Sequence, residues 1–171
     1  VPVLQRPFFF LMLGIFGLGV ALQSLLLLIA HQGLRHSLPK GFHLPALAGA
    51  TLSLAVVISL MAVVIAWWQM PVEVEGQAYY EYLFWGGGHS LQFAYTQLVM
   101  LAWLLLAWHS GVALPGRGAW YAGLLILGFL PVLSTPLIYL LHDTVSLESR
   151  TAFTRQMQMG GGLGVIPLGA L

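Results

Sequence analysis

The chain has 171 residues, of which 59% are hydrophobic and 6% are charged, and its formal net charge is +1. A soluble domain carries about a quarter charged residues, so this composition excludes a soluble globular protein and indicates an integral membrane protein. The low net charge excludes an electrostatic surface for nucleic acid, and the absence of cysteine excludes disulfides, thiolate metal sites and cysteine nucleophiles. We therefore expect an all-α fold, a polytopic bundle of transmembrane helices.

The apolar runs set the number of membrane helices. A helix needs about 20 apolar residues to cross the hydrocarbon core of a bilayer. Four runs meet this length and a fifth begins near the end of the chain, which predicts about five helices in one transmembrane domain covering residues 1–171. In chain order the predicted helices are Pro7–Ala30, Leu44–Trp68, Leu83–Trp108, Trp120–Leu141 and a last one from Ala152 onward. The first residue is Val1, and no polar anchor follows the last run, so we expect an internal part of a longer chain.

The loops between these runs alternate in charge. All five acidic residues lie in the second and fourth loops, whereas the first and third loops contain bases and no acid. Arg35 and Lys40 lie in the first loop and Arg117 in the third. The positive-inside rule therefore places the first and third loops in the cytoplasm and the acidic loops on the outer face.

Two of the six histidines differ from the others. His31, His36, His43 and His109 lie in or beside the basic loops, where an imidazole is usually solvated. His89 lies inside the third predicted helix, and His142 ends the fourth at the same outer end. An ionisable residue inside a membrane helix indicates a functional site by default, and two neutral imidazoles at a similar depth can share copper, iron or zinc. The alternative is that each imidazole bonds to a backbone carbonyl or to water.

The third predicted helix also carries polar residues at helical spacing. His89, Gln92, Phe93, Thr96 and Met100 fall on one face, so the polar members must face protein or a hydrated cavity. Ordinary hydrogen bonding between helices is the alternative for Gln92 and Thr96.

Glycine and proline mark places of close approach and of helix distortion. Gly86, Gly87 and Gly88 allow another backbone or a flat cofactor to come near. Pro131 and Pro136 are expected to kink the fourth helix and to free carbonyl groups for other bonds.

The segment "YYEYLFWGGGHSLQF" (79–93) resembles the sixth transmembrane helix of subunit I of the heme–copper oxidases. The family pattern reads roughly Leu-Tyr-Gln-His-Leu-Phe-Trp-Phe-Phe-Gly-His-Pro-Glu-Val-Tyr, and its histidine at the position of His89 ligates copper. In the family a His-His pair at the outer end of the next helix completes the copper site, and here "YLLHDT" (139–144) offers His142 near that place. The residues that match in register are Tyr80, Leu83, Phe84, Trp85, Gly88 and His89.

The resemblance implies a membrane component of a cytochrome c oxidase-type respiratory enzyme in the prokaryotic plasma membrane, part of a longer twelve-helix subunit. It implies that His89 and His142 hold copper, with Asp143 as a substitute for the missing third histidine, and that Trp85 and Gly88 lie against the cofactor. Gln92 and Thr96 would line a water or proton path. The implied partners are membrane lipid, other oxidase subunits and an electron donor such as cytochrome c or a quinol.

The chain departs from the family pattern at three points. Ser90, Leu91, Gln92 and Phe93 replace Pro-Glu-Val-Tyr, which removes the cross-linked tyrosine from this position. The His-His pair is reduced to His142. The heme-ligating histidines of the family lie on helices outside this chain. Two alternatives to an oxidase therefore stay open: a non-catalytic protein of the same scaffold that binds heme or a metal, and a transporter without a cofactor.

Overall fold

The structure is a computed structural model that describes residues 6–34 and 43–171 and contains only helices and their connections in those ranges. The predicted all-α fold is confirmed. The elements are α1 (Pro7–Leu34), α2 (His43–Gln69), α3 (Gly76–His109), α4 (Gly118–Phe129), the 3₁₀ helix η2 (Leu130–Ser134), α5 (Thr135–Leu141), α6 (Leu147–Gly160) and α7 (Val165–Gly169).

Four helical stretches in the described part of the chain are long and apolar enough to cross a membrane. The shortest has 24 residues, which at about 1.5 Å per residue exceeds the roughly 30 Å hydrocarbon core of a bilayer. It consists of α4, η2 and α5 in direct succession. The chain is therefore a multi-pass membrane protein. The four stretches are Pro7–His31, His43–Gln69, Gly76–His109 and Gly118–Leu141.

The last predicted span is divided into two helices. α6 begins at Leu147, earlier than the predicted Ala152, and ends at Gly160, after which a turn leads into the five residues of α7. At the end of this turn, a Cβ on Gly164 would overlap the carbonyl oxygen of Leu124 and lie 2.9 Å from the Cα of Gly128. The backbone at Gly164 approaches α4 so closely that only glycine fits. This contact lies where the last span is divided into α6 and α7.

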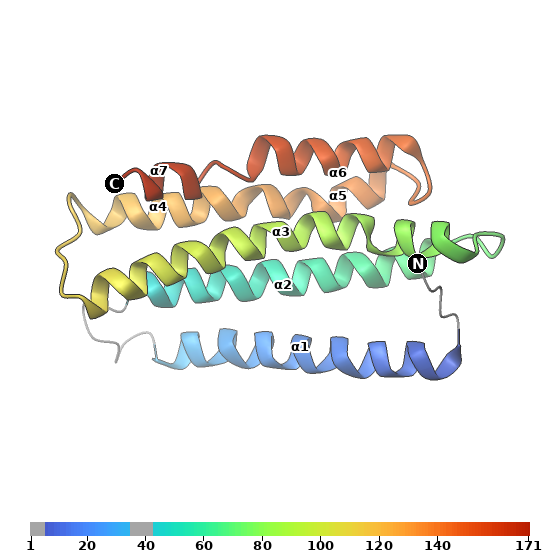
Figure 1. Ribbon diagram of the computed structural model, residues 1–171, viewed down its shortest axis with the longest axis horizontal. Helices are drawn as coiled ribbons and strands as arrows, with labels where there is room; N and C mark the ends of the chain where they lie inside the picture. The colour runs from blue at the N-terminus through green and yellow to red at the C-terminus, as the bar shows by residue number, and fades with distance from the viewer. Residues whose placement is uncertain (1–5, 35–42) are drawn as a thin grey trace.

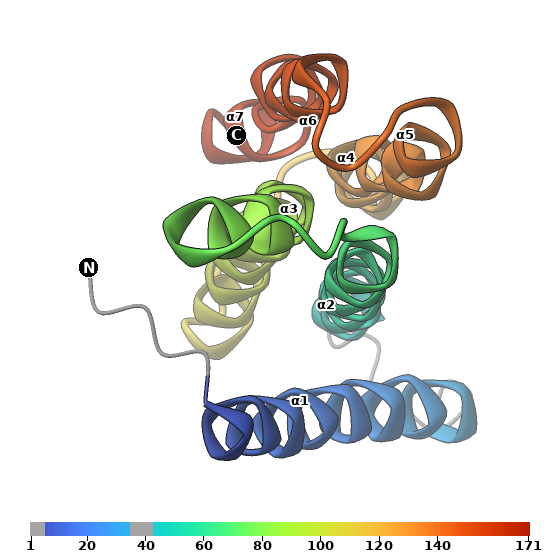
Figure 2. The same ribbon diagram turned by 90° about the vertical axis from the view of Figure 1, so that its right-hand side faces the viewer.

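The helices form three layers. α2 and α3 pack most extensively against each other and form the middle layer, with α1 on one side and the α4–α5 and α6–α7 pairs on the other (Figures 1 and 2). Buried residues of α3 recur at intervals of three and four, so one side of this helix is buried against the neighbouring helices. Within the described residues, each of the three core clusters includes residues of α2 or α3.

The fourth span is interrupted by the 3₁₀ helix η2, and Pro136 follows in the first turn of α5. Pro131 lies in the 3₁₀ helix η2, and its carbonyl oxygen accepts a hydrogen bond from the hydroxyl of Ser134 at 2.8 Å. The same carbonyl accepts a second bond from the amide of Gln156 on α6 at 2.9 Å. The 3₁₀ segment therefore offers a backbone acceptor that joins this span to α6.

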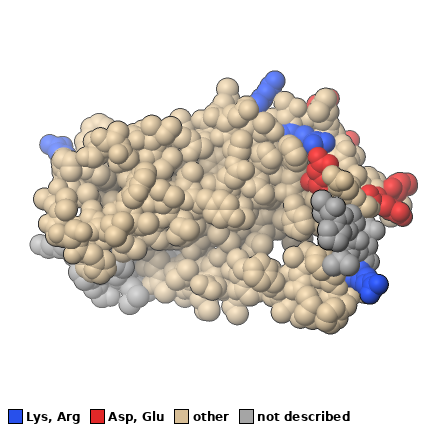
Figure 3. Space-filling model, in the orientation of Figure 1, with Lys and Arg blue, Asp and Glu red and all other residues tan. Residues whose placement is uncertain are grey.

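Both acidic loops lie at the same end of the bundle, as the alternation predicted (Figures 1 and 3). We call this the acidic end and define it by Glu73, Glu75, Glu81, Asp143 and Glu148. Arg117 lies at the opposite end, in the connection between α3 and α4. Arg35, His36 and Lys40 fall outside the described residues, so the assignment of the acidic end to the outer face of the membrane stays a prediction.

Candidate metal site at the acidic end

Three side chains of α3 line up near the acidic end. Glu81, Trp85 and His89 are four residues apart, so they share one face of the helix. Arg150 on α6 meets the first two of them. These contacts connect α3 with α6 near the acidic end.

Arg150 makes three separate contacts with this face. Its Nη2 lies 2.5 Å from Oε1 of Glu81 in an ion pair. Its guanidinium carbon lies 4.3 Å from the centroid of the Trp85 ring, within the range of a cation–π interaction. Its backbone carbonyl accepts a hydrogen bond from the indole Nε1–H of Trp85 at 3.2 Å. The indole is therefore held by the guanidinium on its face and by the carbonyl at its edge.

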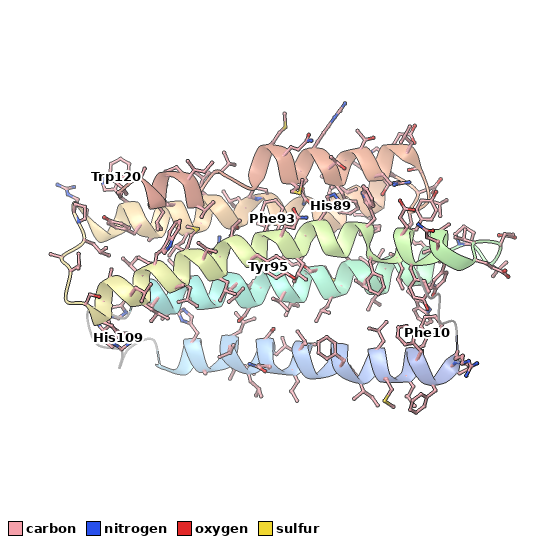
Figure 4. All side chains as sticks on the ribbon, in the orientation of Figure 1. Phe10, His89, Phe93, Tyr95, His109 and Trp120 are labelled. Carbon is pink, nitrogen blue, oxygen red and sulfur yellow. The ribbon has the colours of Figure 1, made fainter. Side chains whose placement is uncertain are left out.

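His89 lies one helical turn further along α3 than Trp85, on the part of α3 that is near α5 and α6 (Figure 4). Its ring centroid is 4.7 Å from that of Trp85, with 31° between the planes. Its Nδ1 lies 2.8 Å from the carbonyl oxygen of Trp85. A carbonyl only accepts, so Nδ1 carries the proton in this bond and the lone pair of the neutral ring is on Nε2. No hydrogen bond to Nε2 is formed within residues 6–34 and 43–171.

This arrangement is the one that metal-binding histidines adopt. Such residues almost always donate the second ring N–H to a carbonyl or carboxylate, which fixes the tautomer and the orientation of the ring. The Nε2 of His89 is thus a suitable ligand for copper, and the half-buried ring is shielded on one side by an indole.

The register of α3 against α5 sets the relative depth of the two predicted ligands. The hydroxyls of Ser90 and Thr135 are 2.7 Å apart, and a Cβ on Gly86 would overlap the hydroxyl of Tyr139. α5 runs toward the acidic end, and His142 is seven residues nearer to that end than Thr135. α3 runs the other way, and His89 is one residue nearer to the acidic end than Ser90. The two histidines, expected at a similar depth, are therefore offset along the bundle by about 9 Å at 1.5 Å per residue.

His142 ends α5 with an extended backbone, and its N–H donates to the carbonyl of Ile138 at 3.0 Å. Its side chain is half-buried, and that of Asp143 is exposed. The carbonyl of Asp143 accepts bonds from the N–H and the hydroxyl of Ser146 at 3.0 Å and 2.7 Å. Within the described residues no group of three His, Asp or Glu side chains could hold a metal ion. Sharing of one copper by His89, His142 and Asp143 stays a prediction.

Tyr139, like Arg150, is a residue near this site that sequence reasoning missed. It is 5% exposed, packs against the ring of Phe153 at 5.1 Å, and its hydroxyl has no hydrogen-bond partner in the described parts of the chain. A buried hydroxyl without a partner is costly and needs an explanation. Its spacing of four from Thr135 could have shown that it faces α3, because Thr135 and Tyr139 lie on one side of α5.

The predicted water path looks different in the structure. Gln92 is exposed on α3, and the hydroxyl of Thr96 bonds to the carbonyl of Phe93 on its own helix at 2.9 Å. The buried polar residues of α3 are instead Ser90 and Gln97, both fully inaccessible. The role of Gln92 and Thr96 in a water or proton path stays a prediction. The polar contacts inside the bundle are made instead by Ser90 and Gln97.

The glycine run serves packing at two of its three positions. Gly86 faces Tyr139 and Phe153, and a Cβ on Gly87 would lie 2.5 Å from the side chain of Val63 on α2. Gly88 is exposed and faces open space within the described structure, so it leaves room beside His89. The contact of Trp85 and Gly88 with a cofactor stays a prediction.

No family model matches the chain, and no solved structure is significantly similar to it. An uncharacterized protein of Rickettsia prowazekii (strain Madrid E) is 26% identical over 176 aligned residues, which cover 97% of this chain and 32% of that protein. An uncharacterized protein of Aquifex aeolicus (strain VF5) is 32% identical over 132 residues, covering 75% of this chain and 31% of that protein. The chain thus spans about a third of the length of these two bacterial relatives.

Proposed function

We propose that the chain belongs to a subunit I-like membrane component of a heme–copper respiratory oxidase, which binds copper through the Nε2 of His89. The hydrogen bond from Nδ1 of His89 to the carbonyl of Trp85 supports this proposal most directly, because it leaves Nε2 as the ligand atom. The motif that resembles the oxidases supplies both residues of this bond.

In this proposal His142 is the second copper ligand and Asp143 the third. Copper beside a heme iron would supply electrons for the reduction of oxygen or nitric oxide. The residues of this chain would hold the metal, and Trp85 covers one face of His89. Because only neutral imidazole binds copper, its affinity should fall at acidic pH as protons compete for the nitrogen atoms.

The heme ligands, other subunits and the electron donor belong to the rest of the proposed enzyme. The two relatives are about three times as long as the region they share with this chain, which leaves room for the additional helices. We propose an electron donor such as cytochrome c or a quinol. Both relatives are bacterial, which supports the plasma membrane of a prokaryote as the location.

A second candidate is a non-catalytic protein of the same scaffold, which binds heme or a single metal. The observation in its favour is the register of α3 and α5, because Tyr139 lies closer in depth to His89 than His142 does. A copper ion held by His89 alone would be bound weakly, since copper prefers several nitrogen or oxygen ligands.

Metal and heme analysis of the full-length protein purified from membranes separates these functions. We expect copper near one per chain together with redox-active heme, and we expect His89→Ala and His142→Ala to lose the copper. His109→Ala is the matched control, because His109 is exposed at the far end of the same helix (Figure 4).

Heme without copper in the wild-type protein would favour the non-catalytic candidate. Absence of both would leave the transporter as the remaining interpretation. Equal copper loss in all three variants would contradict the ligand assignment.

A further inference from the structure

We propose that Arg150 is a positioning residue for His89, which it orients through the ring of Trp85. The inference deepens the proposed function and rests on it in one respect, that the Nε2 of His89 binds a metal. The contacts that carry it form a chain of side chains from the acidic end into the bundle. This chain runs from Glu81 to Arg150, then to Trp85 and His89.

The first link fixes the guanidinium. Glu81 and Arg150 are partly exposed, with side-chain exposures of 41% and 31%, so their ion pair adds little to stability by itself. The effect of the ion pair is geometric, because it fixes the end of the long Arg150 side chain, which otherwise has many rotamers.

The second link fixes the indole. The guanidinium carbon lies over the Trp85 ring, 4.3 Å from its centroid, and the backbone carbonyl of the same Arg150 accepts the Nε1–H. Two contacts from one residue, on the face and at the edge of the ring, leave the indole one orientation. Both contacts come from α6, so the position of α6 determines that of the Trp85 ring.

The third link fixes the imidazole. The centroid of the Trp85 ring lies 4.7 Å from that of the His89 ring, so the indole packs against the imidazole. The carbonyl oxygen of Trp85 accepts the hydrogen bond of Nδ1 at 2.8 Å. The backbone carbonyls of Trp85 and Arg150 stay in place when the Arg150 side chain is replaced, but the cation on the face of the Trp85 ring is lost. The indole then keeps only the bond at its edge and can tilt about it, so the imidazole can rotate away and lose the bond that sets its tautomer. We therefore expect Arg150 to control the fraction of His89 that presents Nε2.

Lysine cannot replace Arg150 in this role. An ammonium pairs with Glu81 as a point charge, whereas stacking on an indole while reaching a carboxylate needs the planar guanidinium. Arg150→Lys thus preserves the charge and removes the geometry, which separates positioning from electrostatics. Arg155→Lys is the matched control, since Arg155 is on the same helix and exposed.

The first readout needs no metal. Solid-state NMR of the full-length, metal-free protein with ¹⁵N-labelled histidine, assigned by loss of signal in His89→Gln, reports the tautomer of His89. We expect the wild type and Arg155→Lys to show the Nδ1–H form. Arg150→Lys, Arg150→Met and Glu81→Gln should show a mixture of tautomers. If one of these variants is poorly folded, the other two still give the answer.

The second readout is copper affinity, measured by competition with a chelator. Loss of a residue that orients a metal ligand weakens binding by about 10- to 100-fold, and we expect this for Arg150→Lys but not for Arg155→Lys. Unchanged His89 tautomers in the Arg150 variants would overturn the positioning role, even if affinity falls. If the wild type binds no copper, the proposed function fails, while the tautomer measurement still decides whether Arg150 orients the ring.

Discussion

Gly86 and Gly88 are two residues apart on α3, and their surroundings are opposite. A Cβ on Gly86 would overlap the hydroxyl of Tyr139 and lie 2.7 Å from the ring of Phe153. A Cβ on Gly88 would meet nothing within 4 Å. The same substitution at the two positions therefore tests the packing of α3 against α5 and α6.

We expect Gly86→Ala to destabilise the protein by about 1–3 kcal/mol, the usual cost of overpacking a core. Gly88→Ala should be neutral or stabilise by up to about 1 kcal/mol, because alanine is the better helix former. Unfolding by a denaturing detergent from mild micelles measures both changes. Equal effects at the two positions would show that the register of α3 against α5 is wrong.

Single residues also show what the sequence could predict about the site. His89 stood out because an imidazole inside an apolar helix needs a partner. Arg150 did not, since it occurs in a loop-like polar stretch 61 residues later and only the packing of α6 on α3 brings it to Trp85. The hydroxyl of Tyr139 was equally hidden, because a tyrosine near the end of a membrane helix usually belongs to the interface.

At the scale of helices, a buried amide joins three spans. The hydroxyl of Thr51 on α2 donates to Oε1 of Gln97 on α3 at 2.8 Å, and Nε2 of Gln97 donates to the carbonyl of Leu125 on α4 at 3.0 Å. Gln97 has no exposed surface. Inside a membrane such bonds replace water as partners, so they help to select which helices pack together.

Thr51→Val keeps the shape of the side chain and leaves the Gln97 oxygen without its donor. We expect a loss of about 0.6 kcal/mol in the free energy of unfolding, up to about 1.7, as measured for hydrogen bonds between membrane helices. Thr96→Val is the matched control and should change little, because the Thr96 hydroxyl bonds only to its own helix. A loss as large for Thr96→Val would remove the special role of the bond between α2 and α3.

The membrane-spanning stretches were predictable from the sequence. The exact ends of the helices and the division of the last span were less predictable. The predicted Trp120–Leu141 agrees with the observed Gly118–Leu141, because hydrophobic length is read directly from the sequence. α3 begins at Gly76, seven residues before the predicted Leu83, since residues that end an apolar run can still continue a helix. The division of the last span depends on the approach of Gly164 to α4, a tertiary contact that no local pattern reveals.

At the scale of the whole molecule, the two acidic loops share one end and thereby fix the relative orientation of the four spans. Because the chain has no cysteine, single introduced cysteines report exposure on each side of the membrane. Val72 and Leu147 are 88% and 73% exposed at the acidic end, and Ala113 is exposed at the other.

A membrane-impermeant maleimide on intact cells should label Val72→Cys and Leu147→Cys, whereas Ala113→Cys should react only after permeabilisation. This pattern follows from the positive-inside rule applied to the loop that contains Arg117. Labelling of Ala113→Cys alone would reverse the orientation, and different results for Val72→Cys and Leu147→Cys would contradict the fold.

The proposed function depends on the coordination of copper by the Nε2 of His89, with the protonated Nδ1 remote from the metal and bonded to Trp85. Pulsed electron paramagnetic resonance of the full-length protein loaded with Cu²⁺ detects the remote nitrogen of a bound imidazole directly. We expect the echo modulation from this remote nitrogen in the wild type and in His109→Ala, and its weakening or loss in His89→Ala. A spectrum that is the same in His89→Ala as in the wild type, or one without any bound imidazole, would contradict this coordination.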